Sequence, residues 1–158
     1  MPRVRRGAME CRFTVIGSPA AQGSKRLVRL KNGRTAMLEN SAKVRPWRQA
    51  VAAAAVDADC AVNDGDVMVW IRARWLRPKS HLSRSGEPRK GAPTRPSRAD
   101  VDKVARSTLD ALTGVAYRDD RQVVCLAVER VWCAEGEREG ADIIVMPAPP
   151  RGDWNYIV

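Results

Sequence analysis

The chain has 158 residues, with 28 Lys and Arg against 18 Asp and Glu, which gives a formal net charge of +10. This length fits one domain, and we expect residues 1–158 to form a single domain with a basic N-terminal extension (1–10) and a C-terminal tail (147–158). Since no apolar run approaches the roughly 20 residues of a membrane helix, the composition excludes a membrane-spanning protein.

The first part of the chain predicts two β elements and a helix. Residues 11–17 alternate between apolar and other side chains, as a half-buried strand does. Residues 27–38 are predicted to form a hairpin, because Asn32-Gly33 is the favoured pair for a two-residue turn in which both residues take a positive φ. A helical spacing of apolar residues then predicts a helix over 44–58.

The second part predicts one helix and three strands. Residues 67–76 alternate as a strand, and 77–98 are rich in Pro, Ser, Gly and basic residues, which is typical of a functional or disordered loop. A helix is expected at 101–112, a strand at 122–133, and a final strand at 141–146 paired with it. This order predicts a small α/β (α+β) domain with a mixed β-sheet and two main helices.

Basic and acidic residues are unevenly distributed, and 22 of the 28 basic residues are Arg. The net charge is +10 over residues 1–48 and +6 over 77–98, but −4 over 99–158. Arg binds phosphate through a planar fork. A basic chain whose acidic residues gather elsewhere indicates a polyanionic partner with a separate acidic site. A merely solubilised surface is the alternative interpretation.

The four cysteines are Cys11, Cys60, Cys125 and Cys133, and they form no CxxC pair and no short disulfide-type spacing. We therefore expect reduced cysteines that act as small buried apolar residues. The N-terminal residues also lack the apolar segment of a signal peptide. Both observations favour a cytoplasmic protein.

Candidate chemistry lies in two pairs of aspartates that flank the second predicted helix. The first acidic pair is Asp100 and Asp102, and the second acidic pair is Asp119 and Asp120. Because His81 is the only histidine, the residue content argues against catalysis by a Ser/His/Asp or Cys/His set and against a Cys/His zinc site. Carboxylates without histidine are the ligands that Mg²⁺ and Mn²⁺ use.

Helix geometry limits how the first acidic pair can converge. Residues two apart inside a helix point roughly 200° apart, so Asp100 and Asp102 could share a metal only if Asp100 is still extended or is the N-cap. The helix would then begin at the metal, with its positive end close to anionic groups. The adjacent members of the second acidic pair would face opposite ways in an extended segment, so one would be a ligand and the other would orient it or fix the turn.

Each acidic residue also has a structural interpretation. Ser97 and Asp100 fit a capping box, which would explain Asp100 without a metal. Asp102 and Arg106 have the i, i+4 spacing of an ordinary surface ion pair. The second acidic pair could be a polar turn before a strand. Taken together beside a basic loop, the four aspartates favour a metal site.

The run 95–124 resembles the RusA family of Holliday junction resolvases. The family pattern is an Asp-x-Asp, a helix containing Leu-Asp-Ala-Leu and a Gly, and then Asp-Asp with Gln-Val. The matching residues here are Asp100-Val101-Asp102, Leu109-Asp110-Ala111-Leu112-Thr113-Gly114, Asp119-Asp120 and Gln122-Val123. The N-terminal Gly17-Ser18-Pro19 followed by Gly23-Ser24-Lys25-Arg26 also looks like the family's opening.

This resemblance implies a homodimeric, Mg²⁺-dependent (or Mn²⁺-dependent) endodeoxyribonuclease that resolves four-way DNA junctions in recombination and repair, in a bacterial host cell and often encoded by a phage. It further implies that Asp100, Asp102 and Asp120 bind the metal and that Asp119 is a neighbouring acid needed for activity. The alternative is a non-catalytic or differently specific branched-DNA-binding protein.

The chain departs from the family pattern beside the first acidic pair. Arg106 stands where the family usually has a catalytic Lys, and Lys103 stands where Asn is common. Arg holds its charge but donates no proton at neutral pH. The resemblance therefore implies a phosphate-clamping role for Arg106 and excludes a general-acid role. Asp110, on the same helix, is expected to be a structural partner.

Phosphate contacts are expected from a basic arm (25–34) and from the basic loop (77–98). Within the loop, we expect His81 to be a solvated loop residue. The predicted DNA-binding residues are Lys25, Arg26, Arg29, Lys31, Arg34, Lys79, Arg89, Lys90, Arg95, Arg98 and Lys103.

Overall fold

A four-stranded mixed sheet forms the centre of the protein. The computed structural model describes residues 10–23, 25–39 and 42–150. The strands lie in the order β1 (Cys11–Ile16), β6 (Gly140–Pro147), β4 (Val67–Trp75) and β5 (Val123–Trp132). β6 runs antiparallel to both of its neighbours, whereas β5 runs parallel to β4. The expected α+β class with a mixed sheet and two main helices is confirmed.

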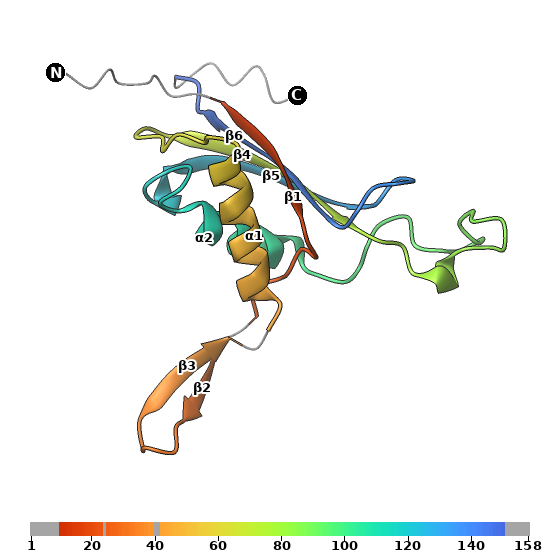
Figure 1. The fold of residues 1–158 in the computed structure, drawn as a ribbon, viewed down its shortest axis with the longest axis horizontal. Coiled ribbons are helices and arrows are strands. Elements are labelled where there is room, and N and C mark those ends of the chain that lie inside the picture. The colour runs from red at the N-terminus through yellow and green to blue at the C-terminus, as the bar shows by residue number, and fades with distance from the viewer. Residues whose placement is uncertain (1–9, 24, 40–41, 151–158) are drawn as a thin grey trace.

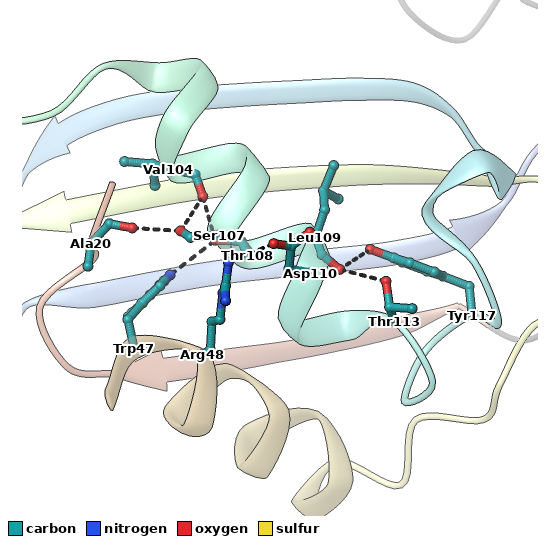
Figure 2. Close-up of polar contacts among 10 residues, drawn as sticks. All are labelled: Ala20, Trp47, Arg48, Val104, Ser107, Thr108, Leu109, Asp110, Thr113 and Tyr117. Carbon is teal, nitrogen blue, oxygen red and sulfur yellow. Dashed lines mark hydrogen bonds and ion pairs between the residues drawn. The ribbon is translucent and has the colours of Figure 1, made fainter. Parts of the chain in front are cut away.

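Two helices, α1 (Val44–Asp57) and α2 (Val101–Leu112), cover one face of this sheet (Figure 1). Alternate residues of β4 from Val67 to Trp75 point to this face and are buried, as the alternation predicts. The helices contact each other through Trp47, whose indole Nε1 donates a hydrogen bond to Thr108 Oγ1 at 3.2 Å (Figure 2). This hydrogen bond therefore fixes the position of α2 relative to α1.

Both helices begin and end close to the expected residues. Pro46 lies in the first turn of α1, where its missing N–H removes no helical hydrogen bond. Asp100 is the N-cap of α2, with φ −67° and ψ 133°. Gly114, with φ +80°, follows the C-cap residue Thr113, and a positive φ at this place is typical of a glycine that ends a helix. No helix of the described residues is long and apolar enough to cross a membrane.

A β-hairpin arm made of β2 (Lys25–Arg29) and β3 (Thr35–Glu39) stands apart from the sheet (Figure 1). The predicted hairpin is confirmed, but the prediction of a two-residue turn is wrong. Only Gly33 has a positive φ (79°), and Gly33 N–H donates to Leu30 O while Leu30 N–H donates to Arg34 O. The longer loop lets Asn32 keep a negative φ, so only the glycine adopts the left-handed conformation.

The prediction that the last two strands, β5 and β6, pair with each other is also wrong. β6 lies between β1 and β4 and forms no backbone hydrogen-bond ladder with β5. The chain leaves β5 and crosses over the end of β4, where Cys133 N–H donates to Trp75 O and Leu76 N–H donates to Glu139 Oε1. Gly140 fits the place beside β1, since a Cβ there would stand 1.9 Å from the Val15 carbonyl oxygen. Alternation in the sequence predicts the faces of a strand but not its neighbour.

The basic loop, residues 77–98, folds back on itself and is attached to the end of β5. It contains a short 3₁₀ helix, η1 (Lys79–His81), and its attachment point is Trp132. The Trp132 indole donates to Pro93 O at 2.9 Å, and the Arg77 guanidinium lies 5.0 Å from the centre of the Trp132 ring. His81, expected to be a solvated loop residue, is half-buried and packs its ring edge-on against Trp132, with the centroids 5.8 Å apart.

Cys11 and Cys60 form a disulfide, with their Cα atoms 5.6 Å apart, so the expectation of four reduced cysteines is wrong. The bond joins the start of β1 to the segment after α1, residues that are 49 positions apart in the chain. No local spacing pattern predicts this disulfide, because only the folding of the chain brings the two cysteines within bonding distance. Cys125 and Cys133 are free and half-buried.

We predict that the oxidised protein exposes two titratable thiols of four after unfolding. Cross-linking a chain segment of about 50 residues restricts the unfolded state, so reduction is expected to lower the free energy of unfolding by up to about 4 kcal/mol. Thiol titration and urea unfolding with and without reductant measure both effects. The variant Cys125→Ser/Cys133→Ser is the control and should keep the reductant-sensitive stability; four reactive thiols in air-oxidised protein would contradict the disulfide.

Candidate active site

The first acidic pair lies at the N-terminus of α2. Asp100 is the N-cap, but its side chain makes no capping hydrogen bond, and its carboxylate pairs instead with Lys103 Nζ at 2.8 Å. Hydrogen bonding and charge attraction from Lys103 lower the pKa of Asp100 below its usual value. The proposed capping box between Ser97 and Asp100 is therefore absent. Because Asp100 is extended and Asp102 is in the first turn, both exposed carboxylates lie at the positive end of the helix.

Contacts from the sheet and from the segment after β1 hold the N-terminal end and the middle of α2. Arg130 Nη1, on β5, donates to the carbonyl of Ala99 at 2.5 Å. Ser107 Oγ donates to Ala20 O at 2.6 Å (Figure 2). The backbone N–H of Gln22 donates to Lys103 O at 3.0 Å. The family-like opening of the chain thus packs directly against the helix that carries the first acidic pair.

The second acidic pair opens a short 3₁₀ helix, η2 (Asp120–Gln122), that leads into β5. Asp119 is its N-cap and accepts a hydrogen bond from Arg121 N–H at 2.9 Å. The Arg121 guanidinium bonds both carboxylate oxygens of Asp119 at 3.0 Å. These bonds hold the pKa of Asp119 far below its usual range, so Asp119 remains ionised. Asp120 is exposed beside it.

Gln122 fixes the turn that carries the second acidic pair. Its Oε1 accepts from the backbone N–H groups of Arg118 (2.8 Å) and Asp119 (3.0 Å). Its Nε2 donates to the carbonyls of Asn63 (3.0 Å) and Gly65 (2.6 Å), just before β4. One amide therefore satisfies four backbone groups and attaches the acidic turn to the sheet.

Tyr117 connects the acidic turn to the C-terminal end of α2. Its buried hydroxyl donates to Leu109 O at 2.9 Å (Figure 2). Burial, and then the negative charges of Asp120 and Asp110, raise the pKa of Tyr117 well above its ordinary value. Tyr117 is therefore a neutral structural donor. The sequence contained no signal for this role, and Gln122 was recognised only as part of the Gln-Val motif.

The two acidic pairs lie at opposite ends of the molecule's main helix. α2 has 12 residues, so it separates them by about 18 Å along its axis. β5 gives a second, independent measure. Arg130 bonds to Ala99 beside the first acidic pair, whereas the second acidic pair precedes Val123, about 23 Å away along the strand. Within the described residues, no group of three His, Cys, Asp or Glu side chains could hold a metal ion.

Of the remaining charged residues on the exposed side of α2, one forms an ion pair with α1 and two do not pair with each other. Asp110 pairs with Arg48 on α1 at 2.6 Å, which agrees with its expected structural role (Figure 2). Asp102 and Arg106 form no ion pair with each other in the part of the chain that the structure describes. Both are exposed, one turn apart on the same side of α2. Arg106 is thus free to approach a group bound near the first acidic pair.

The predicted DNA-binding residues lie mostly on two projecting elements. Arg29, Lys31 and Arg34 are exposed on the hairpin arm; the side chains of Lys25 and Arg26 lie outside the described residues. The basic loop exposes Lys79, Lys90 and Arg98, together with two residues engaged at the surface: Arg89, which donates to Leu82 O, and Arg95, which pairs with Glu129. Lys103 pairs with Asp100 and does not belong to either element.

Comparison with known proteins gives two matches. The family model described as "Endodeoxyribonuclease RusA" matches residues 17–143, which include both acidic pairs. The chain is also 32% identical over 132 residues to "Uncharacterized protein YqaN" of Bacillus subtilis (strain 168), an alignment that covers 80% of this chain and 92% of that protein.

We predict that Gln122→Ala destabilises the protein by about 1–3 kcal/mol, because two backbone carbonyls and two backbone N–H groups lose their partner. Urea unfolding measures the loss. Gln49→Ala, an exposed position on α1, is the control and should change stability little. Equal stability of the two variants would show that the Gln122 bonds do not hold the turn.

Proposed function

Because the chain belongs to the RusA endodeoxyribonuclease family, we propose that it is a divalent-metal-dependent endonuclease that resolves four-way DNA junctions by paired hydrolysis of phosphodiester bonds, in recombination and repair. The observation that carries this proposal is that the family match spans both acidic pairs and the helix between them. Two pairs of carboxylates at the surface, beside strongly basic projecting elements, suit a nuclease that grips DNA and cuts it.

The proposed metal ligands are Asp100, Asp102 and Asp120, with Asp119 as a neighbouring acid that Arg121 keeps ionised. A set of carboxylates fits a hard cation such as Mg²⁺ or Mn²⁺. Such a cation would supply an activated water and charge relief on the phosphate. The residues of a single protomer do not fit around one ion, because α2 separates the two acidic pairs.

We propose that a homodimer resolves this mismatch. If two protomers meet antiparallel across a two-fold axis, the first acidic pair of one protomer faces the second acidic pair of its partner, and two equal sites result. The opposite-end placement of the pairs supports this arrangement, since an isologous contact brings opposite ends together. A two-fold enzyme with two sites suits a junction with approximate two-fold symmetry.

Arg106 is proposed to clamp a DNA phosphate next to the first acidic pair. It is exposed on the same side of α2 as Asp102 and keeps its charge at any physiological pH. Lys103 is engaged by Asp100, so it is the poorer candidate for this contact. The hairpin arm and the basic loop would bind the DNA backbone on either side, which positions the substrate but does not select a sequence.

The alternative function is a non-catalytic or differently specific protein that binds branched DNA. The replacement of the family's usual Lys by Arg106 is the observation that favours it, because Arg donates no proton at neutral pH. We propose that the protein acts in the bacterial cytoplasm, and this location rests on the DNA substrate alone. The cysteines do not support it, because a disulfide such as Cys11–Cys60 is unusual in a cytosolic protein.

We predict that Asp102→Asn lowers cleavage of a labelled four-way junction at least 100-fold in Mg²⁺ or Mn²⁺ while junction binding persists, because a ligand charge is lost but the DNA grip is not. Asp57→Asn, at the exposed end of α1, is the control and should cleave like the wild type. A wild-type protein that binds junctions yet cuts none with any divalent cation would support the non-catalytic alternative. Equal cutting of linear duplex would exclude junction specificity.

We also predict that two inactive variants restore each other. In a heterodimer of Asp102→Asn with Asp120→Asn, one composite site carries both substitutions and the other carries neither. Equal mixing after subunit exchange should therefore recover about one quarter of the wild-type sites, measured as nicking of one junction strand. Sites contained within single protomers would give no recovery, and each variant alone is the control.

A further inference from the structure

Two adjoining pockets lie where the chain leaves β1 for the hairpin arm and returns from the arm to α1. The first, the apolar pocket, has a volume of about 460 Å³ and its nonpolar walls include Ile16, Pro46, Trp47 and Ala50. A Cβ on Gly17, which also lines this pocket, would stand 3.9 Å from the Ala50 Cβ and 4.0 Å from the Trp47 ring. Gly17 therefore leaves open a space that any other residue would narrow.

The second pocket, the basic pocket, has a volume of about 380 Å³ and shares Ser18 and Lys43 with the apolar pocket. Arg98 brings a second positive charge to it, and no acidic residue of the described chain lines either pocket. Lys43 and Arg98 are exposed, and neither forms an ion pair with any residue that the structure describes. Two unpaired cations around one hollow attract an anion, and an Arg guanidinium matches the geometry of a phosphate.

The basic pocket lies beside the first acidic pair, and both pockets have fixed walls. Ala99 lines the basic pocket and directly precedes Asp100, and the Ala99 carbonyl is held by Arg130 at 2.5 Å. Ala20 lines the basic pocket and Trp47 lines the apolar pocket, and each makes a hydrogen bond to the middle of α2 (Figure 2). A ligand held in the basic pocket is therefore placed next to the carboxylates that are proposed to bind the metal.

We propose that the two pockets together bind one unstacked nucleotide of branched DNA, with its base in the apolar pocket and its phosphate on Lys43 and Arg98. This inference rests on the proposed function and names the part of the substrate that lies next to the first acidic pair. Extruding a base costs stacking energy, and the cost is lowest where stacking and pairing are already disturbed, as at a branch point. Both pocket volumes lie in the range of ligand sites, roughly 300–1,000 Å³.

The combination of the two pockets favours a nucleotide over other ligands. A duplex whose bases stay stacked would use the cations but leave the apolar pocket empty. A nonpolar peptide would fill the apolar pocket but would gain nothing from Lys43 and Arg98. Because a continuous duplex offers no disturbed stack, these pockets also discriminate branched from linear DNA, which phosphate contacts on the hairpin arm and the basic loop do not.

A fluorescent base tests the extrusion. The base 2-aminopurine is quenched while it is stacked, so at one of the branch-point positions of a four-way junction it should brighten at least 2-fold when the wild type binds without a divalent cation. Ala50→Leu fills the apolar pocket and should abolish this increase, with an unchanged far-ultraviolet circular dichroism spectrum. It should also lower the preference for the junction over linear duplex at least 10-fold. Ala53→Leu, the same change at an exposed position of α1 outside the pockets, is the matched control and should behave like the wild type.

Salt dependence tests the phosphate half of the site. Lys43→Gln should weaken junction binding about 5-fold and reduce the slope of log affinity against log salt concentration by about 1, because one phosphate contact is lost. Arg45→Gln removes the same charge from an exposed residue two positions away that lines neither pocket, and it should leave the slope unchanged. Equal losses in the two variants would show a general effect of surface charge and would overturn the phosphate site.

The outcomes separate this proposal from the nuclease itself. A wild type that cuts junctions but brightens 2-aminopurine at no branch-point position, or an Ala50→Leu variant that brightens it as the wild type does, would overturn the nucleotide site and leave the proposed function intact. A wild type that unstacks the base but cuts no junction with any divalent cation would support the nucleotide site and reject the nuclease.

Discussion

The position of α2 on the sheet is the constraint on which the rest of the structure depends. Two hydroxyl side chains in its middle, Ser107 and Thr108, are fully buried and bond to Ala20 and Trp47. The helix can neither slide nor rotate without breaking these bonds and leaving buried polar groups unsatisfied. Since the acidic residues lie at its two ends, the packing at its centre sets how far apart the carboxylates stand.

The two ends of α2 are supported in different ways. The first acidic pair sits on an exposed helix terminus whose backbone is positioned by Arg130 and the segment after β1. The second acidic pair sits on a turn in which the backbone N–H groups of Arg118 and Asp119 donate to Gln122 and that of Arg121 donates to the Asp119 carboxylate. One acidic pair is therefore carried by a helix dipole and the other by a hydrogen-bonded turn.

The sequence predicted the local features well and the long-range ones poorly, for physical reasons. Alternation over β4 and the helical spacing over α2 depend on one face being buried, so they are visible in the residues themselves. The neighbour of β6 and the bond between Cys11 and Cys60 depend on the path of the chain, which no local pattern records. The turn at Gly33 differed because one additional loop residue spares Asn32 an unfavourable φ.

The candidate site shows the same division. Its four aspartates were predicted from order and spacing, and the condition that Asp100 be an extended N-cap is met. Their proximity in the sequence nevertheless hid their separation in space, because most of the residues between the two acidic pairs belong to the helix α2 and not to a loop. A junction nuclease benefits from that separation under the proposed arrangement. If each site takes carboxylates from two chains, a lone protomer holds no complete site, and cutting is confined to the symmetric dimer that can cut both strands.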